Sequence, residues 1–221
     1  MLTSRCLPIA FALTTLAAAP AGDNARARPI VRPGEEIVYA VHSSRFGNIG
    51  KATLRVESDT LDGRPAYRLS FDFSARVALF KVSDHTRSWL DTEQLRTLRY
   101  SKSESSPLGG RKEDVRVGDD VATSQPLDEL SFIYFVRALD LPVGDTIVVN
   151  RHFDPARNPV RITAVGPCYY EMRVPDPRQK SGSSRLRFLI ADDDTRVPLR
   201  IESDMPVAGR ITMTLVSTRQ Q

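Results

Sequence analysis

The sequence predicts a mainly β protein: an antiparallel curved sheet or half-barrel, built as a meander and wrapped around one buried α-helix. Three observations predict this class. Apolar and polar residues alternate along most of the chain in short segments separated by turn-forming residues. One segment, DELSFIYFVRALDLPVG at 128–144, breaks this alternation with five consecutive bulky apolar residues. Strands in close succession with a single helical segment favour an antiparallel meander over βαβ units.

The first residues have the pattern of a secretory signal peptide. Arg5 supplies a positive charge, an apolar run extends from Cys6 to Leu16, and small residues follow up to Ala21. We expect cleavage after Ala21 and export to the periplasm. The apolar run is shorter than the roughly 20 residues that a membrane-spanning helix needs, so a protein that does not span the membrane is predicted. Cys6 lies too far upstream of the cleavage point to carry a lipid anchor.

The remaining chain has the size of one domain. We expect an extended leader over 22–33, a single β-rich domain over 34–217 and a tail over 218–221. Loss of the signal removes Arg5 and no acid, which lowers the net charge from +4 to +3. This mild excess is spread along the chain, whereas a nucleic-acid-binding face needs clustered cations, so no nucleic acid is expected as a partner.

The alternation defines the strands in order. The clearest is YRLSFDFSARV at 67–77, where one side is apolar and the other polar, and it follows Asp62-Gly63, a hairpin signal. PDPRQKSGSSR at 175–185 is the longest polar loop. The expected strands cover residues 35–42, 51–58, 67–77, 82–91, 95–103, 112–117, 146–152, 160–165, 169–174, 185–191, 197–203 and 210–217.

The apolar segment is predicted to be a helix from Asp128 to Asp140. Asp128 is a good N-cap, while Pro142 and Gly144 are helix terminators. The apolar residues point in nearly every direction on a helical wheel, as in a helix that is buried on all sides. A fully buried strand is the alternative, because Phe, Ile, Tyr and Val favour β structure. Arg137 either pairs with a buried acid of the strands or extends past the rim of the sheet.

The same segment carries a resemblance. Together with GEEIVYAV, HFDPARNPVRI and RVPLRIESDMPVAGRITMTLVS, it is similar to the exported bacterial family known as domain of unknown function 3108, from Gly34 to Ser217. The residues that carry the resemblance are Asp128, Leu130, Ser131, Tyr134 and Arg137. The resemblance implies an antiparallel sheet curled around a helix, similar in architecture to periplasmic lipoprotein carriers. It implies no established activity.

The sequence shows no nucleophile elbow, zinc signature or phosphate loop, so no enzymatic activity and no cofactor are expected. His42, His85 and His152 fall on separate predicted strands, and we interpret them as surface histidines. Asp192, Asp193 and Asp194 fit a hairpin turn better than a calcium loop, which spaces its ligands at alternate positions. Asp119-Asp120 is interpreted in the same way. Cys168 is interpreted as a small buried residue of a strand, with an intermolecular or redox role as the alternative.

Aromatic residues supply the candidate ligand-binding site. Tyr39, Phe71, Phe73, Trp89 and Tyr100 come from strands expected to be neighbours, and several can face one concave surface. They either pack against the helix or line an apolar slot for a lipid-like guest.

The leading functional hypothesis is a periplasmic binding or carrier protein for a lipid-like or apolar ligand. The alternative is a structural or adaptor module of the cell envelope, with no ligand cavity, that binds a protein partner through its surface. A transmembrane barrel also fits the alternation, but the predicted strands vary in length and the chain ends without an aromatic residue.

Overall fold

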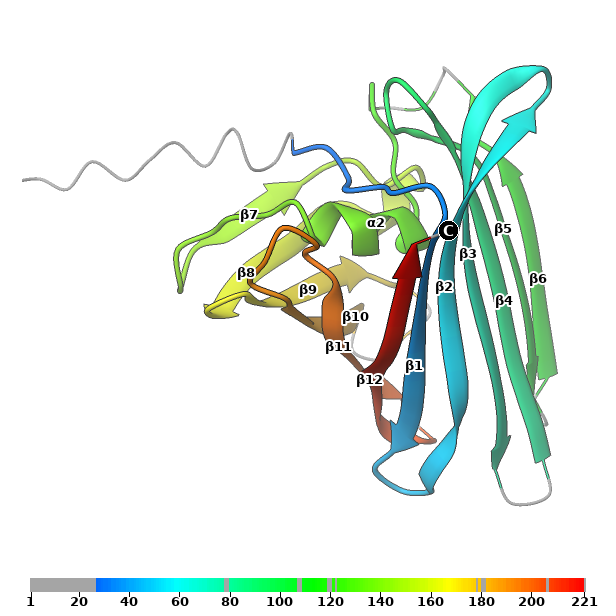
Figure 1. The fold of residues 1–221 in the computed structure, drawn as a ribbon, viewed down its shortest axis with the longest axis vertical. Coiled ribbons are helices and arrows are strands. Elements are labelled where there is room, and N and C mark those ends of the chain that lie inside the picture. Colours follow the sequence, from blue (N-terminus) through cyan, green and yellow to red (C-terminus); the bar gives the residue numbers. More distant parts are fainter. Residues whose placement is uncertain are drawn as a thin grey trace, which may run out of the picture.

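The computed structural model describes residues 27–77, 80–106, 109–118, 121, 123–177, 179, 182–205 and 207–220. The predicted signal peptide and Asp119-Asp120 fall outside these residues. Twelve strands form one antiparallel, curved sheet that does not close (Figure 1). The predicted fold class is confirmed. The strands are β1 Glu35–Ser43, β2 Gly47–Leu61, β3 Arg64–Val77, β4 Phe80–Asp91, β5 Thr97–Ser106, β6 Gly109–Arg116, β7 Thr146–Val149, β8 Val160–Gly166, β9 Tyr169–Pro175, β10 Ser183–Ile190, β11 Pro198–Met205 and β12 Gly209–Gln220.

The sheet consists of two meanders that meet in its middle. The strand order is β6-β5-β4-β3-β2-β1-β12-β11-β10-β9-β8-β7, so β1 pairs with β12 and the two edges are β6 and β7. The chain must therefore cross from one edge to the other between these two strands. This crossing segment contains the helix α2, Glu129–Val136, which lies on the hollow side of the sheet (Figure 1). Connectivity thus places the helix inside the curve.

Helix α2 is capped by its own sequence. The Asp128 carboxylate accepts hydrogen bonds from the backbone N–H of Leu130 at 2.8 Å and of Ser131 at 2.9 Å, and the Ser131 hydroxyl accepts one from the Asp128 N–H. All residues from Leu130 to Val136 are buried. The predicted helix, buried on every side, is confirmed.

The helix is shorter than predicted, since it ends at Val136 and not near Asp140. The next residues form a tighter turn, in which the N–H groups of Ala138 and Leu139 bond carbonyls three residues back. The Arg196 guanidinium donates to the carbonyl oxygens of Arg137 and Leu139, at 3.0 and 2.6 Å. Tertiary hydrogen bonds therefore replace a further helical turn, and a cation at this end also suits the helix dipole.

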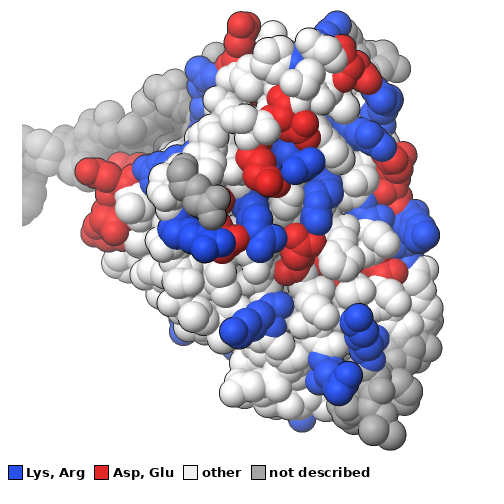
Figure 2. Space-filling model, turned by 45° about the vertical axis from the view of Figure 1, so that its right-hand side comes forward, with Lys and Arg blue, Asp and Glu red and all other residues white. Residues whose placement is uncertain are grey.

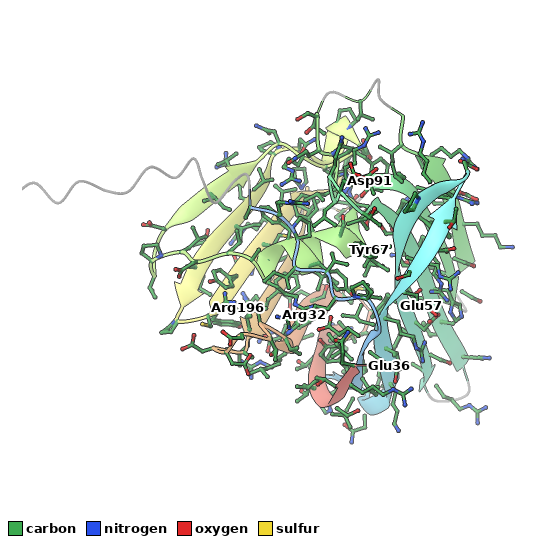
Figure 3. The ribbon with its side chains drawn as sticks, turned by 45° about the horizontal axis from the view of Figure 1, so that its top comes forward. Arg32, Glu36, Glu57, Tyr67, Asp91 and Arg196 are labelled. Carbon is green, nitrogen blue, oxygen red and sulfur yellow. The ribbon has the colours of Figure 1, made fainter. Side chains whose placement is uncertain are left out.

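Arg137 takes the first of its two predicted positions. Its side chain is completely buried and donates to both carboxylate oxygens of Glu35, the first residue of β1, at 2.6 and 2.8 Å. Two backbone carbonyls, of Thr195 and Arg196, accept its remaining hydrogen bonds. Figure 3 shows Arg32 and Arg196 near this junction, and Arg32 also donates to the carbonyl of Thr195. The turn at Thr195 and Arg196 thus connects the leader, through Arg32, with the end of the helix, through Arg137.

The described part of the leader, from residue 27 onward, is extended and packs on the helix. The Ile30 N–H donates to the Tyr134 carbonyl at 3.0 Å, and the Arg151 guanidinium donates to the Ala27 carbonyl.

The predicted strands agree closely with the observed ones except for the segment 146–152, where β7 ends at Val149. Asp62 and Gly63 form the predicted turn, with φ angles of 53° and 79°. Within the described residues, no helix has the length and apolarity needed to cross a membrane.

Candidate ligand-binding cavity

The concave face of the sheet extends well beyond the helix. Helix α2 has 8 residues, about 12 Å in length, whereas strands β3 and β4 have 14 and 12 residues and span about 40–45 Å. The helix therefore shields only one part of the hollow side. Near it, Leu69 and Leu90 are fully buried. Figure 3 shows Tyr67 on the side of β3 that faces the helix.

Toward the other end of the strands, where β1 turns into β2, several apolar side chains of the concave face are half-buried, although Val41 and Ala75 beside them are buried. The half-buried side chains pack against the core on one side and remain partly exposed on the other. Partly exposed apolar side chains on a concave surface are one feature of sites that bind apolar ligands. These half-buried residues are Phe71, Phe73, Val82, Leu186, Ile211 and Met213.

A cavity of about 280 Å³ lies between the helix and this open end. It lies between the two meanders, because its walls come from β5 and β6 on one side and from β9, β10 and β11 on the other. Small-molecule pockets typically begin near 300 Å³, so the cavity suits a small ligand or one end of a chain. Its apolar lining consists of Tyr100, Phe132, Met172, Val174, Leu186 and Met205, and its polar lining of Lys102, Glu104, Arg111, Glu129, His152, Arg157, Asp176, Gln179, Ser184 and Ser203.

The charged side chains of the cavity form two groups. At the helix, Arg157 contacts Glu129 and approaches Asp176 to 3.4 Å. On the opposite wall, Lys102 lies 2.7 Å from Glu104 and 3.3 Å from Asp84. Because cations and anions alternate, neither sign dominates. The cavity thus joins apolar surface to paired charges, and it can accept a molecule that has both an apolar and a polar part.

His152 is buried at the inner end of this cavity, which corrects the prediction of a surface histidine. Its ring stacks between Phe132 and Phe153, with centroids 6.1 and 5.0 Å away. Burial lowers the pKa of the imidazole below its ordinary value, although nearby acids act in the opposite direction. The prediction failed because the chain leaves β7 at Val149 and pairs with Leu127 beneath the helix, so His152 is not a strand residue.

The five predicted aromatic residues do not all reach this site. Tyr100 lines the cavity, and Phe71 and Phe73 lie on the open concave face. Tyr39 is fully buried, and its hydroxyl donates to the Pro198 carbonyl at 2.9 Å. Burial raises the pKa of the Tyr39 and Tyr100 hydroxyls, so both remain protonated hydrogen-bond donors.

Trp89 lies on the opposite, convex face. Its indole N–H donates to Asp59 at 3.0 Å, and its ring lies 5.0 Å from the guanidinium of Arg99. The register explains this position, because Trp89 pairs with Arg68 and Arg99, whereas its neighbour Leu90 points into the core. Trp89 is therefore no part of the cavity, in contrast to the prediction.

Sequence reasoning missed the charged residues of the cavity. Lys102 and Glu104 carried a usable signal, since they continue the alternation that starts at Tyr100 and so face the same side. Arg157 and Asp176 carried no such sequence signal. They belong to the segments after β7 and β9, outside any strand or long helix, and only the tertiary fold brings them together.

The remaining candidate residues, Asp193 and Cys168, make hydrogen bonds within turns of the fold. Asp193 caps the turn before β11 by accepting hydrogen bonds from the N–H groups of Thr195 and Arg196, as predicted for a hairpin turn. Cys168 lies half-buried in the β8–β9 turn at a φ of 48°, not in a strand, and its Sγ accepts a hydrogen bond from Arg196 at 3.5 Å. Within the described ranges, no group of His, Cys, Asp and Glu is arranged to hold a metal ion.

Comparison with known proteins supports the family resemblance. The family model described as protein of unknown function DUF3108 matches residues 38–125. The resemblance is confirmed over this range, which ends before the helix and its residues from Asp128 to Arg137. A solved structure, a β-barrel-like protein of domain of unknown function DUF1849 from Brucella abortus, is similar with a TM-score of 0.47 and 11% identity, over 87% of this chain and 100% of that one. No curated protein matches the chain.

Proposed function

We propose that this DUF3108-like chain is an exported periplasmic binding or carrier module that holds a lipid-like amphiphile in the hollow of its sheet. The observation that carries the proposal is the half-buried apolar surface beyond helix α2, which shares Leu186 with a cavity of about 280 Å³. A protein that only filled its own core would bury these side chains, because exposed apolar area is unfavourable. A bound acyl chain would cover them.

The charged side chains of the cavity would contact the polar headgroup of the ligand. Lys102 and Arg111 line the wall formed by β5 and β6, opposite the apolar residues Met172 and Leu186 of β9 and β10. Each cation has an acid nearby, so a ligand headgroup would exchange protein ion pairs for its own. The chain of the ligand would extend over the apolar wall. This combination favours an amphiphile over a hydrocarbon.

Binding to a fluorescent fatty acid, anthroyloxy-stearate, tests the proposal. Leu186→Glu puts a charge on the concave wall and should weaken binding at least about tenfold, because burying an uncompensated charge against an acyl chain costs more than 1.4 kcal/mol. Leu189→Glu on the same strand is the matched control, since Leu189 is also half-buried but faces the convex side. It should bind as the parent protein does.

Two results would count against the proposal. One is equal affinity in the Leu186 and Leu189 variants when both melt as the parent protein does. The other is native mass spectrometry of protein incubated with envelope lipids that returns only the bare chain. The second result would favour the surface adaptor, and a specific protein recovered with the chain would then identify its partner.

A further inference from the structure

The convex face of β2 to β6 divides into two halves of different charge. Near the helix end it alternates cations with acids, as in the pairs Arg68–Glu57 and Arg99–Asp114. Toward the other end the acids stop. Figure 2 shows this change: red and blue mix above, whereas the lower part of the visible face carries blue alone.

The acid-free half, here called the basic face, is defined by four exposed cations: Lys51, Arg76, Lys81 and Lys112. The register places Lys51, Arg76 and Lys81 on the adjacent strands β2, β3 and β4, since Arg76 pairs with Lys81 and Lys51 lies opposite Ser74. Lys112 lies on the edge strand β6. Their neighbours on this surface are Ser74, Ser83, Ser103 and Ser105. None of the four cations forms an ion pair with a described acid. The acids that border this face are engaged elsewhere: Asp72 pairs with Arg55, His85 and Arg87, and Asp114 pairs with Arg99.

The same end of the sheet exposes apolar side chains. Phe46 lies in the β1–β2 turn with 46% of its surface exposed, and Val207 lies in the β11–β12 turn with 56% exposed. Hydrogen bonds hold the two turns side by side: the Ser43 hydroxyl donates to the Ala208 carbonyl at 2.7 Å and Arg45 donates to the Val207 carbonyl at 2.9 Å. We call Phe46 and Val207 the apolar tips.

One of the tips, Val207, lies two residues from a residue of the cavity. Met205, which lines the cavity, is itself 50% exposed and precedes the turn that carries Val207. The one described acid near this turn, Asp204, is paired with Arg210 at 3.3 Å. The open end of the sheet therefore presents apolar tips beside a basic face, and the turn with Val207 adjoins the cavity through Met205.

We propose that this end of the molecule docks on a bilayer that contains anionic lipid. Cations attract the negatively charged headgroups, and exposed apolar side chains at the same end of the molecule enter the boundary between headgroups and acyl chains. A soluble polyanion would use the cations and leave the apolar tips without a function. The arrangement of both features at one end favours the bilayer. The inference does not depend on what occupies the cavity.

Co-sedimentation with vesicles tests it. The purified protein should bind vesicles of phosphatidylglycerol and phosphatidylethanolamine, bind phosphatidylcholine vesicles weakly, and lose affinity as salt is raised. Changing Lys51, Arg76 and Lys81 together to Gln should weaken binding about 100-fold, at roughly fivefold for each charge. The control changes Arg68, Arg99 and Arg116 to Gln. It removes the same net charge from the acid-rich half and should weaken binding far less.

The tips are tested with Phe46→Ser combined with Val207→Ser, which should lower the affinity for anionic vesicles at least about tenfold. Val143→Ser combined with Val165→Ser is the control, since these residues are also exposed but lie away from the open end. Equal loss in the two charge variants, or no binding to anionic vesicles, would overturn the proposal. So would unchanged vesicle binding by the tip variant together with equal binding to soluble dextran sulfate.

Both the basic-face and the tip variants should still bind anthroyloxy-stearate, because none of their residues lines the cavity. Failure of membrane docking and failure of ligand binding are thus separate results.

Discussion

Glu35 and Arg137 form a two-point ion pair in the core, with oxygen-to-nitrogen distances of 2.6 and 2.8 Å, although they lie 102 residues apart in the chain. Arg137 follows the last residue of the helix and Glu35 is the first residue of β1. The pair therefore fixes the end of the crossing segment to the strand at the centre of the sheet. It is a buried polar link between the helix and the half-barrel.

Removing one partner of this pair should be costly. Glu35→Ala leaves a buried guanidinium without its carboxylate, and we expect the free energy of unfolding to fall by about 3–5 kcal/mol. Glu36→Ala, which breaks contacts with Arg55 and Arg219 on the outer face, should cost about 1 kcal/mol or less. Urea denaturation followed by circular dichroism measures both. Restored stability in Glu35→Leu combined with Arg137→Met would show that the cost comes from the unpaired charge.

Asp128 should be the most sensitive position of the helix. Its carboxylate caps two backbone N–H groups and also accepts hydrogen bonds from the buried hydroxyls of Ser88 and Thr97. Asp128→Ala loses the cap and leaves these donors unsatisfied, for an expected cost of about 3 kcal/mol or more. Asp154→Ala, which removes a half-buried cap of the short 3-10 helix Pro155–Arg157, should cost about 1 kcal/mol. If Asp128→Ala and Asp154→Ala lowered the denaturation midpoint equally, the hydrogen bonds from Ser88 and Thr97 would not contribute to the stability of the helix.

His152 should make the protein less stable in acid. Burial lowers the pKa of its imidazole in the folded state, so the unfolded chain binds a proton first as the pH falls. Its stabilising contribution is complete above the unfolded pKa near 6.5 and decreases as the pH falls from there to the folded pKa, by up to about 1.4 kcal/mol per pH unit.

The comparison of His152→Phe with His42→Phe measures this contribution. His152→Phe keeps an aromatic ring between Phe132 and Phe153, and its unfolding free energy should depend less on pH below 6.5. His42 is exposed on β1, and its variant should keep the slope of the parent protein. Parallel pH profiles for the parent protein and His152→Phe would contradict the assignment.

Trp89 should not affect ligand binding. Its indole lies on the convex face against Arg99 and Asp59, with the sheet between it and the cavity. Trp89→Phe should therefore bind anthroyloxy-stearate with unchanged affinity and lose about 1 kcal/mol of stability, from the indole hydrogen bond and the cation–π contact. Titration of the fluorescent probe checks the first expectation. A large loss of affinity with an unchanged melting temperature would move the site to the convex face.

The sequence by itself determined the strands and the buried helix. Period-two alternation indicates which side of a strand faces the core, and an apolar segment with an Asp N-cap indicates a helix that is buried on all sides. Both patterns are local in the sequence. The alternation in β4 also places Trp89 with His85 and Arg87 on the polar side, so the position of Trp89 on the convex face agrees with the local pattern.

Only the tertiary structure decided the pairing of β1 with β12, the end of the helix at Val136 and the contents of the cavity. Each of these depends on groups distant in sequence. The helix stops where Arg196, almost 60 residues away, binds its carbonyls. Arg157 and Asp176 meet because two loops converge under the helix. Periodicity describes which face of an element is apolar, but contacts between loops are set by how the elements pack.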